Sequence, residues 1–190
     1  MEQPSKIKHA IDNLRKNRMT NIGIVLILLL LIASAFSPYF LDPYNLQSLI
    51  RDIAFISIIA LGQACLLIIG EIDLSVGKIA ALCGVIGGML MVNGSLHPYL
   101  ALAICLVLGA LLGAINGTIV TRLHLNSLVV TIGMTGVYGG INLVLTKGKA
   151  ITGIPEEIYF LGQGALFGIP MPFVLMIVVM VVVIFIAKYT

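Results

Sequence analysis

The feature that most constrains this sequence is a succession of six apolar segments, each close to the ~20 residues that a helix needs to cross a bilayer. They cover residues 21–36, 49–69, 74–92, 98–120, 127–145 and 172–187. Hydrophobic residues make up 59% of the 190 positions and charged residues only 10%, whereas a soluble domain averages about 25% charged residues. We therefore expect an all-α integral membrane protein, a polytopic helical bundle of about six transmembrane helices.

Proline and short polar side chains predict where several of these helices begin. Asn45 is a suitable N-cap for the second segment, Ser127 can cap the fifth, and Pro98 suits the first position of the fourth. The Gly/Pro-rich stretch 147–170 is too polar and too broken to span, and Pro172 then opens the sixth segment.

A basic leader at residues 1–20 precedes the first segment, which we expect to be an uncleaved helix. A signal peptide is the competing interpretation, because Ala33-Ser34-Ala35 resembles a cleavage site. The leader is expected to be cytoplasmic and the protein to be a multi-pass component of the bacterial inner (plasma) membrane, because six crossings then place eight basic residues inside against three outside. The inner set is Lys6, Lys8, Arg15, Lys16, Arg18, Lys78, Arg122 and Lys188, and the outer set is Arg51, Lys147 and Lys149.

Residues 70–78, reading Gly-Glu-Ile-Asp-Leu-Ser-Val-Gly-Lys, place Glu71 and Asp73 between two apolar segments. A charged side chain at bilayer depth costs about 2.5–3.5 kcal/mol. On a continuous helix these two carboxylates would point about 200° apart, so one would face lipid. The bracketing Gly70 and Gly77 therefore predict a broken helix over 70–78, and broken backbone at this depth lines a cavity or packs in protein.

The candidate residues for a transport path or gate are accordingly Gly70, Glu71, Asp73, Ser75 and Gly77. The alternative is structural, with Asp73 or Ser75 capping the third helix, where free N–H groups favour an oxygen acceptor. Capping accounts for Asp73 but leaves Glu71 without an explanation.

Glycines at helical spacing predict close helix packing. Gly109, Gly113 and Gly117 form one smooth face on the fourth segment, and Gly84 and Gly88 repeat the spacing on the third. Such small-residue faces let membrane helices approach closely.

No catalytic or metal-binding constellation is evident. His9, His97 and His124 lie in separate loops or the leader, and the three cysteines lack metal or redox spacing. The glycine spacing of 70–78 is wrong for a phosphate loop, and Ile79 stands where Ser or Thr is required. No basic patch for nucleic acid is present.

Several motifs in order resemble one known family. Glu71-Ile-Asp-Leu-Ser-Val-Gly77, preceded by Ala60-Leu-Gly62, is similar to the signature of ribose-type monosaccharide ABC importer permeases, the inner-membrane components of binding-protein-dependent transport systems. The matches continue with Gly113-Ala-Ile-Asn116-Gly117 and Val120, Thr131-Ile-Gly133, and Leu143-Val-Leu-Thr146 with Gly148 and Ile151. The resemblance covers the chain from about Pro38 to its C-terminus.

The resemblance implies a translocation subunit without enzymatic chemistry of its own. It implies a second permease subunit, a cytoplasmic ABC ATPase that carries the ATP and Mg, and an extracytoplasmic sugar-binding protein. It also implies alternating access for a monosaccharide solute within the membrane lipid. Family members have roughly ten helices, so on this resemblance the chain is a C-terminally truncated or split permease, without the coupling loop and later helices.

The sequence departs from the family in two places. Gly139-Gly140 stands where the family commonly has Arg-Gly, and Lys147-Gly-Lys149-Ala150 replaces a more neutral stretch. A pentose, a hexose and a signalling molecule with a similar skeleton all remain open as the solute. The alternative class is a secondary, ion-coupled transporter, which also uses broken helices.

Overall fold

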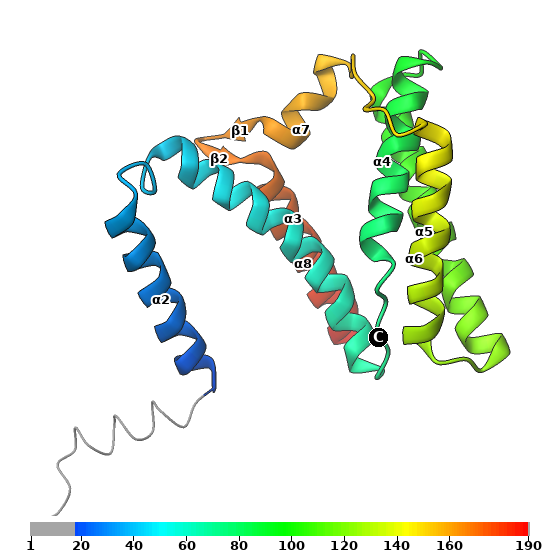
Figure 1. Cartoon of the computed structure of the whole chain (residues 1–190), viewed down its shortest axis with the longest axis horizontal. Helices are drawn as coiled ribbons and strands as arrows, with labels where there is room; N and C mark the ends of the chain where they lie inside the picture. Colours follow the sequence, from blue (N-terminus) through cyan, green and yellow to red (C-terminus); the bar gives the residue numbers. More distant parts are fainter. Residues whose placement is uncertain (1–17, 190) are drawn as a thin grey trace, which may run out of the picture. The chain divides into compact units, whose positions relative to one another are not determined.

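The computed structural model describes residues 18–189 and is almost wholly helical (Figure 1). Its long helices are α2 (Arg18–Phe36), α3 (Pro43–Ile68), α4 (Val76–Val92), α5 (Pro98–Leu123), α6 (Ser127–Thr146) and α8 (Met171–Tyr189). Between α6 and α8 lie the 3-10 turn η1 (Glu156–Ile158), the short helix α7 (Tyr159–Gln163) and the antiparallel strands β1 (Ala165–Leu166) and β2 (Ile169–Pro170). The basic leader predicted for residues 1–20 lies almost entirely outside the described residues.

Five of these helices, α2, α3, α5, α6 and α8, are long and apolar enough to cross a membrane. Helix α4 has 17 residues, which makes it about 26 Å long against a hydrocarbon core of about 30 Å. The crossing predicted at 74–92 is therefore completed by the non-helical residues that precede α4. The prediction of an all-α polytopic membrane protein is confirmed.

The chain forms two compact units, and the boundary between them falls between Leu49 and Ile50. In the first unit, Asp42 caps α3, because its Oδ1 accepts a hydrogen bond from the N–H of Tyr44 at 2.8 Å, and Pro43 takes the first helical position. The predicted cap Asn45 is wrong: it lies inside α3, and its Nδ2 donates to the carbonyl of Phe40 at 2.8 Å.

In the second unit, α4, α5 and α6 pack side by side (Figure 1, green to yellow). Their core contains Ile79 and Leu82 of α4 and Tyr138 of α6, all nearly inaccessible. Partly buried side chains packed against this core are Cys83, Ile86, Leu112 and Met134. Pro98 takes the first position of α5, as predicted, and α8 begins at Met171, one residue before the predicted Pro172.

The contact between α4 and α5 uses two cysteine–glycine pairs. A Cβ built at Gly87 would lie 2.6 Å from Sγ of Cys105, and one at Gly109 would lie 3.6 Å from Sγ of Cys83. Each cysteine therefore occupies the space above a glycine of the other helix. The Sγ of Cys105 also lies 3.1 Å from the carbonyl oxygen of Cys83, which it can reach as a weak donor.

The other glycines of the predicted packing faces have different surroundings. A Cβ at Gly88 would meet Ile154 at 3.2 Å, so this glycine is covered by the segment after α6 and not by α5. No heavy atom lies within 4 Å of a Cβ built at Gly84, Gly113 or Gly117. These three positions border open space, whereas Gly87, which the glycine spacing did not indicate, makes the closest helix contact.

We expect Gly87→Ala to loosen the α4–α5 contact, because the new methyl group would lie well inside contact distance of the Cys105 sulfur. Overpacking of this kind costs about 1–3 kcal/mol. Thermal unfolding of the detergent-solubilised protein measures the loss. Adding Cys105→Ala should restore stability. Gly136→Ala is the matched control, because no heavy atom lies within 4 Å of a Cβ built at Gly136. A Gly87→Ala protein as stable as the wild type would contradict this contact.

Candidate functional site at the broken crossing

The chain breaks between α3 and α4, as the acidic motif predicts. Helix α3 ends at Ile68, and Gly70 has a φ of +81°, a conformation that a glycine adopts without strain. The N–H of Glu71 then bonds back to the carbonyl of Leu66 at 3.0 Å, which closes the end of the helix. The break covers residues 69–75 and not 70–78, because Gly77 lies in the first turn of α4.

Lys78 also lies in the first turn of α4 and not in a loop. A Cβ built at Gly139 of α6 would lie 3.8 Å from both Cδ and Cε of Lys78, so the stem of this side chain lies along α6. Lys78, which the charge count places on the inner side, therefore lies along a helix of the bundle.

Every backbone N–H from Ile69 to Ser75 has an acceptor. The first three bond to carbonyls in the last turn of α3. The next are held by side chains, beginning with Gln63 of α3, whose Oε1 accepts from the N–H of Asp73 at 3.3 Å while its Nε2 donates to the Asp73 carbonyl. Non-helical backbone persists at membrane depth only where its polar groups are satisfied in this way.

One face of helix α6 supplies further hydrogen-bond partners for the backbone of the broken segment. Ser127 Oγ accepts from the N–H of Ile72 at 3.4 Å, and Thr131 Oγ1 accepts from the N–H of Leu74 at 3.1 Å. The hydroxyl of Thr135 is shared between the carbonyl of Thr131 in its own helix at 2.8 Å and the carbonyl of Leu74 at 3.3 Å. These hydroxyls lie at i, i+4 and i+8 on one helix face, and the segment follows them about 12 Å along α6. The break therefore runs from the end of α6 toward its middle.

The prediction that Ser127 caps this helix is wrong. Asn126 is the N-cap residue, and its Oδ1 accepts from the N–H of Leu128 at 2.9 Å. Two adjacent polar residues could each have served as the cap. The hydroxyl of Ser127 is engaged instead by the N–H of Ile72, which is 55 residues away in the sequence.

A buried polar cluster joins the end of the break to α5 and α6. We call Asp73, Ser75, Asn116 and Tyr138 the Asn116 cluster. Ser75, Asn116 and Tyr138 are 0%, 3% and 2% exposed. The Asn116 Nδ2 donates to Ser75 Oγ at 2.7 Å and lies 3.4 Å from Asp73 Oδ2, and its Oδ1 accepts from the Tyr138 hydroxyl at 2.9 Å.

The carboxylate of Asp73 uses both oxygens in this cluster. Its Oδ1 accepts from the N–H and the hydroxyl of Ser75, both at 2.7 Å, and its Oδ2 faces Asn116. Ser75 is the N-cap residue of α4 by position, yet its side chain makes no capping bond. Asp73 accepts from the N-cap residue itself and from no N–H in the first turn of α4, so neither Asp73 nor Ser75 makes the predicted capping bond. The Oδ2 of Asp73 ties the break to a neighbouring helix through Asn116.

Asn116 and Tyr138 were not among the candidate site residues predicted from the sequence. Asn116 was noted only within the glycine motif of the fourth segment. A polar amide inside a long apolar run is itself a signal, because polar groups within membrane helices generally face protein or water. Tyr138 gives a weaker signal, since a tyrosine ring is also an ordinary core side chain.

A cavity of about 280 Å³ lies beside the broken segment. Glu71 and Asp73 line it from the break, and Gly113, Asn116 and Gly117 line it from α5. The carboxylate of Glu71 is half-buried and makes no hydrogen bond or ion pair within the described residues. Across residues 18–189, no three His, Cys, Asp or Glu side chains gather as a metal site would require.

The fold and the site define the class: a multi-pass membrane protein with one discontinuous crossing that borders a cavity. A family model described as "Branched-chain amino acid transport system / permease component" matches residues 45–190. The chain belongs to this family of transport permeases, and it is a multi-pass protein of the bacterial inner membrane.

Curated relatives carry more specific names. The chain is 36% identical over 159 residues to the ribose import permease protein of Bacillus subtilis, covering 83% of this chain and 49% of that protein. It is 35% identical over 152 residues to the L-arabinose ABC transporter permease protein of Azospirillum brasilense (79% and 44%), and 31% identical over 156 residues to an autoinducer 2 import system permease protein of Enterobacter sp. (82% and 45%). The chain thus spans about half the length of these relatives. No solved structure matches it.

Proposed function

We propose that this chain is a membrane-spanning permease subunit of an ATP-driven ABC importer for a monosaccharide, such as ribose, or a related small polar solute. The observation that carries the proposal is the similarity, over about four-fifths of the chain, to permeases named for ribose, L-arabinose and autoinducer 2 import. The family description names branched-chain amino acids, whereas these three relatives are named for ribose, L-arabinose and autoinducer 2.

The proposed partners are a second permease subunit, a cytoplasmic ABC ATPase that binds ATP and Mg, and an extracytoplasmic sugar-binding protein. In this scheme the chain itself carries no catalytic residue. The broken segment acts in the transport path or gate through Gly70, Glu71, Asp73 and Ser75, with Gly77 beginning the helix that follows. Its bonds to α3, α5 and α6 support this role, because movement of any of these helices would displace it.

The proposed orientation has a cytoplasmic N-terminus. The stem of Lys78 lies against Gly139 within α6, so Lys78 is left out of the count and the eight inner basic residues become seven, against three outside. The positive-inside rule still favours this orientation. The broken segment and the α5–α6 connection then lie toward the cytoplasm, on the side where an ATPase would bind.

Deletion of the gene in its own host tests the proposal. We expect the deletion strain to lose uptake of one solute from a panel that includes labelled ribose and L-arabinose, and the full chain supplied in trans to restore it. Uptake should stop when cellular ATP is depleted and should continue when a protonophore removes the proton gradient while ATP is maintained.

Two results would contradict the proposal. Unchanged uptake of the whole panel in the deletion strain would remove the transport role. Uptake that fails with the protonophore although ATP remains would instead indicate a secondary, ion-coupled transporter.

A further inference from the structure

Lys78 places a cation at an unusual depth between α4 and α6. The stem of Lys78 lies along Gly139, which is twelve residues after Ser127 and seven before Thr146. The ammonium group is therefore about 18 Å from one end of α6 and about 10 Å from the other. Because Cε itself lies at this level, the side chain does not reach either end of the helix.

This cation has no partner within the described residues. Lys78 is exposed, and no carboxylate or other acceptor bonds to its ammonium there. A lysine facing lipid at such depth costs about 2.5–3.5 kcal/mol even on the lenient scale, and such residues normally face a bundle interior or a water-filled path. The face of α4 and α6 that carries Lys78 is thus better suited to an aqueous path than to lipid.

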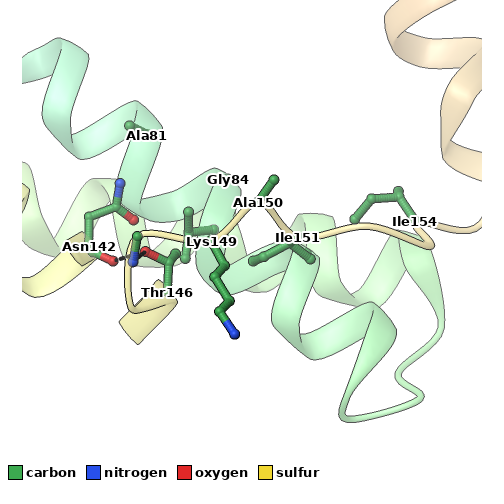
Figure 2. Close-up of a pocket in the computed structure, with 11 residues that line it drawn as sticks. Ala81, Gly84, Asn142, Thr146, Lys149, Ala150, Ile151 and Ile154 are labelled. Atoms are coloured by element: carbon green, nitrogen blue, oxygen red, sulfur yellow. Dashed lines mark hydrogen bonds between the residues drawn. The ribbon is translucent and has the colours of Figure 1, made fainter. Parts of the chain in front are cut away.

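Beyond Lys78 along α4 and α6 lies a second cavity, which is larger than the one beside the break. Contacts between the chain at the start of α4 and α6 follow one another along α6: Leu74 contacts Thr135, and Lys78 contacts Gly139 one turn later. One turn farther lies this cavity of about 500 Å³, lined by Ala81 and Gly84 of α4 and by Asn142 and Thr146 of α6 (Figure 2). Volumes of about 300–1,000 Å³ are typical of small-molecule sites.

The walls of this cavity combine small side chains with a free acceptor. Nothing lies within 4 Å of a Cβ built at Gly84, so no helix fills the space above it. Asn142 Oδ1 is buried and has no hydrogen-bond donor among the described residues. Buried oxygens normally have a donor, and Thr146 cannot supply one because its hydroxyl donates to the Asn142 carbonyl at 2.9 Å.

We propose that the facing surfaces of α4 and α6, from Lys78 to the cavity at Thr146, form the path along which the solute passes, and that this path takes a polyhydroxylated solute. Hydroxyl groups both accept and donate, so one molecule can accept from the Lys78 ammonium and donate to the Asn142 amide oxygen. This inference rests on the proposed function and adds the location of the solute path and the polar groups that contact the solute.

Kinetics of uptake in the native host test the role of the cation. Lys78→Met keeps the length of the side chain and removes its charge, so we expect KM for uptake to rise about tenfold with an unchanged amount of protein in the membrane. Lys188→Met, at the exposed end of α8, is the matched control and should leave KM unchanged. If Lys78 instead pairs with a carboxylate of a partner helix, the variant will lower the amount of assembled protein without changing KM, and the proposal is overturned.

Protection from alkylation tests the location independently of turnover. In a Cys65→Ala background, a thiol introduced by Ala81→Cys should react with a small maleimide, and the transported monosaccharide should slow this reaction while a non-transported sugar should not. Equal reaction rates with and without the transported sugar would overturn the proposal. Neither negative result affects the proposed importer function, because that function is tested by uptake in the deletion strain.

Discussion

Asn116→Leu is expected to destabilise the protein severely. The leucine has a similar volume but leaves the Ser75 hydroxyl without its donor at 2.7 Å and Asp73 Oδ2 without the Asn116 amide at 3.4 Å. The Tyr138 hydroxyl loses its acceptor at 2.9 Å and keeps only the Leu112 carbonyl at 3.2 Å. Loss of one partner in a buried polar network costs the full desolvation of each group left behind. The sum is about 3–5 kcal/mol, and thermal unfolding of the solubilised protein measures it.

Two variants calibrate this prediction. Tyr138→Phe removes a single hydroxyl from the same cluster and should cost about 1 kcal/mol. Thr118 lies on the same helix as Asn116, and its exposed hydroxyl bonds only to the carbonyl of Ala114. Thr118→Ala should therefore change stability little. An Asn116→Leu protein that unfolds at the wild-type temperature would show that the cluster does not hold the broken segment.

Asp73→Asn is expected to be harmful, although the two side chains have nearly the same shape. An asparagine can keep its oxygen toward the N–H of Ser75, but its NH₂ group then faces the Nδ2 of Asn116, where the carboxylate oxygen was 3.4 Å away. Two donors opposed in a buried site cost about 1–3 kcal/mol. We expect reduced uptake and reduced stability. Capping alone predicts little effect, because Asn caps about as well as Asp.

An exchange of the two side chains separates these explanations. Asp73→Asn combined with Asn116→Asp places a donor opposite an acceptor again and should recover much of the loss. Glu71→Gln is the matched control for stability, because it removes the same charge two residues away from a side chain with no hydrogen bond in the described part of the chain. An Asp73→Asn protein with normal uptake and stability would reduce Asp73 to a helix cap.

The sequence predicted the parts of the fold that depend on composition and on local chemistry. The apolar segments identified the long helices. Gly70 and the neighbouring carboxylates identified the break, because glycine adopts a positive φ without strain and a charged side chain in a continuous membrane helix is costly. Local rules were less successful where two polar residues compete. Asp42 and Asn126 cap their helices, and the nearby Asn45 and Ser127 bond elsewhere.

The sequence predicted only part of the site, because the side chains that bond to the broken segment come from distant parts of the chain. The hydroxyls of Ser127, Thr131 and Thr135 can be placed on one helix face from their spacing, yet nothing local indicates that they bond to backbone more than fifty residues earlier. In the same way, glycine spacing favoured Gly84 and Gly88, whereas the close contact with α5 is made by Gly87 against Cys105. Pairing between helices is tertiary information.

The most direct test of the account is a nitroxide scan of residues 68–80, with Cys65, Cys83 and Cys105 first replaced by alanine. Collision with relaxation agents in lipid and water reports exposure at each position. We predict alternation with a period of two through the break, with Ile72 and Leu74 exposed and Ser75 buried, followed by helical periodicity from Val76. One uninterrupted helical period from α3 into α4 would contradict the broken crossing on which the proposed path depends.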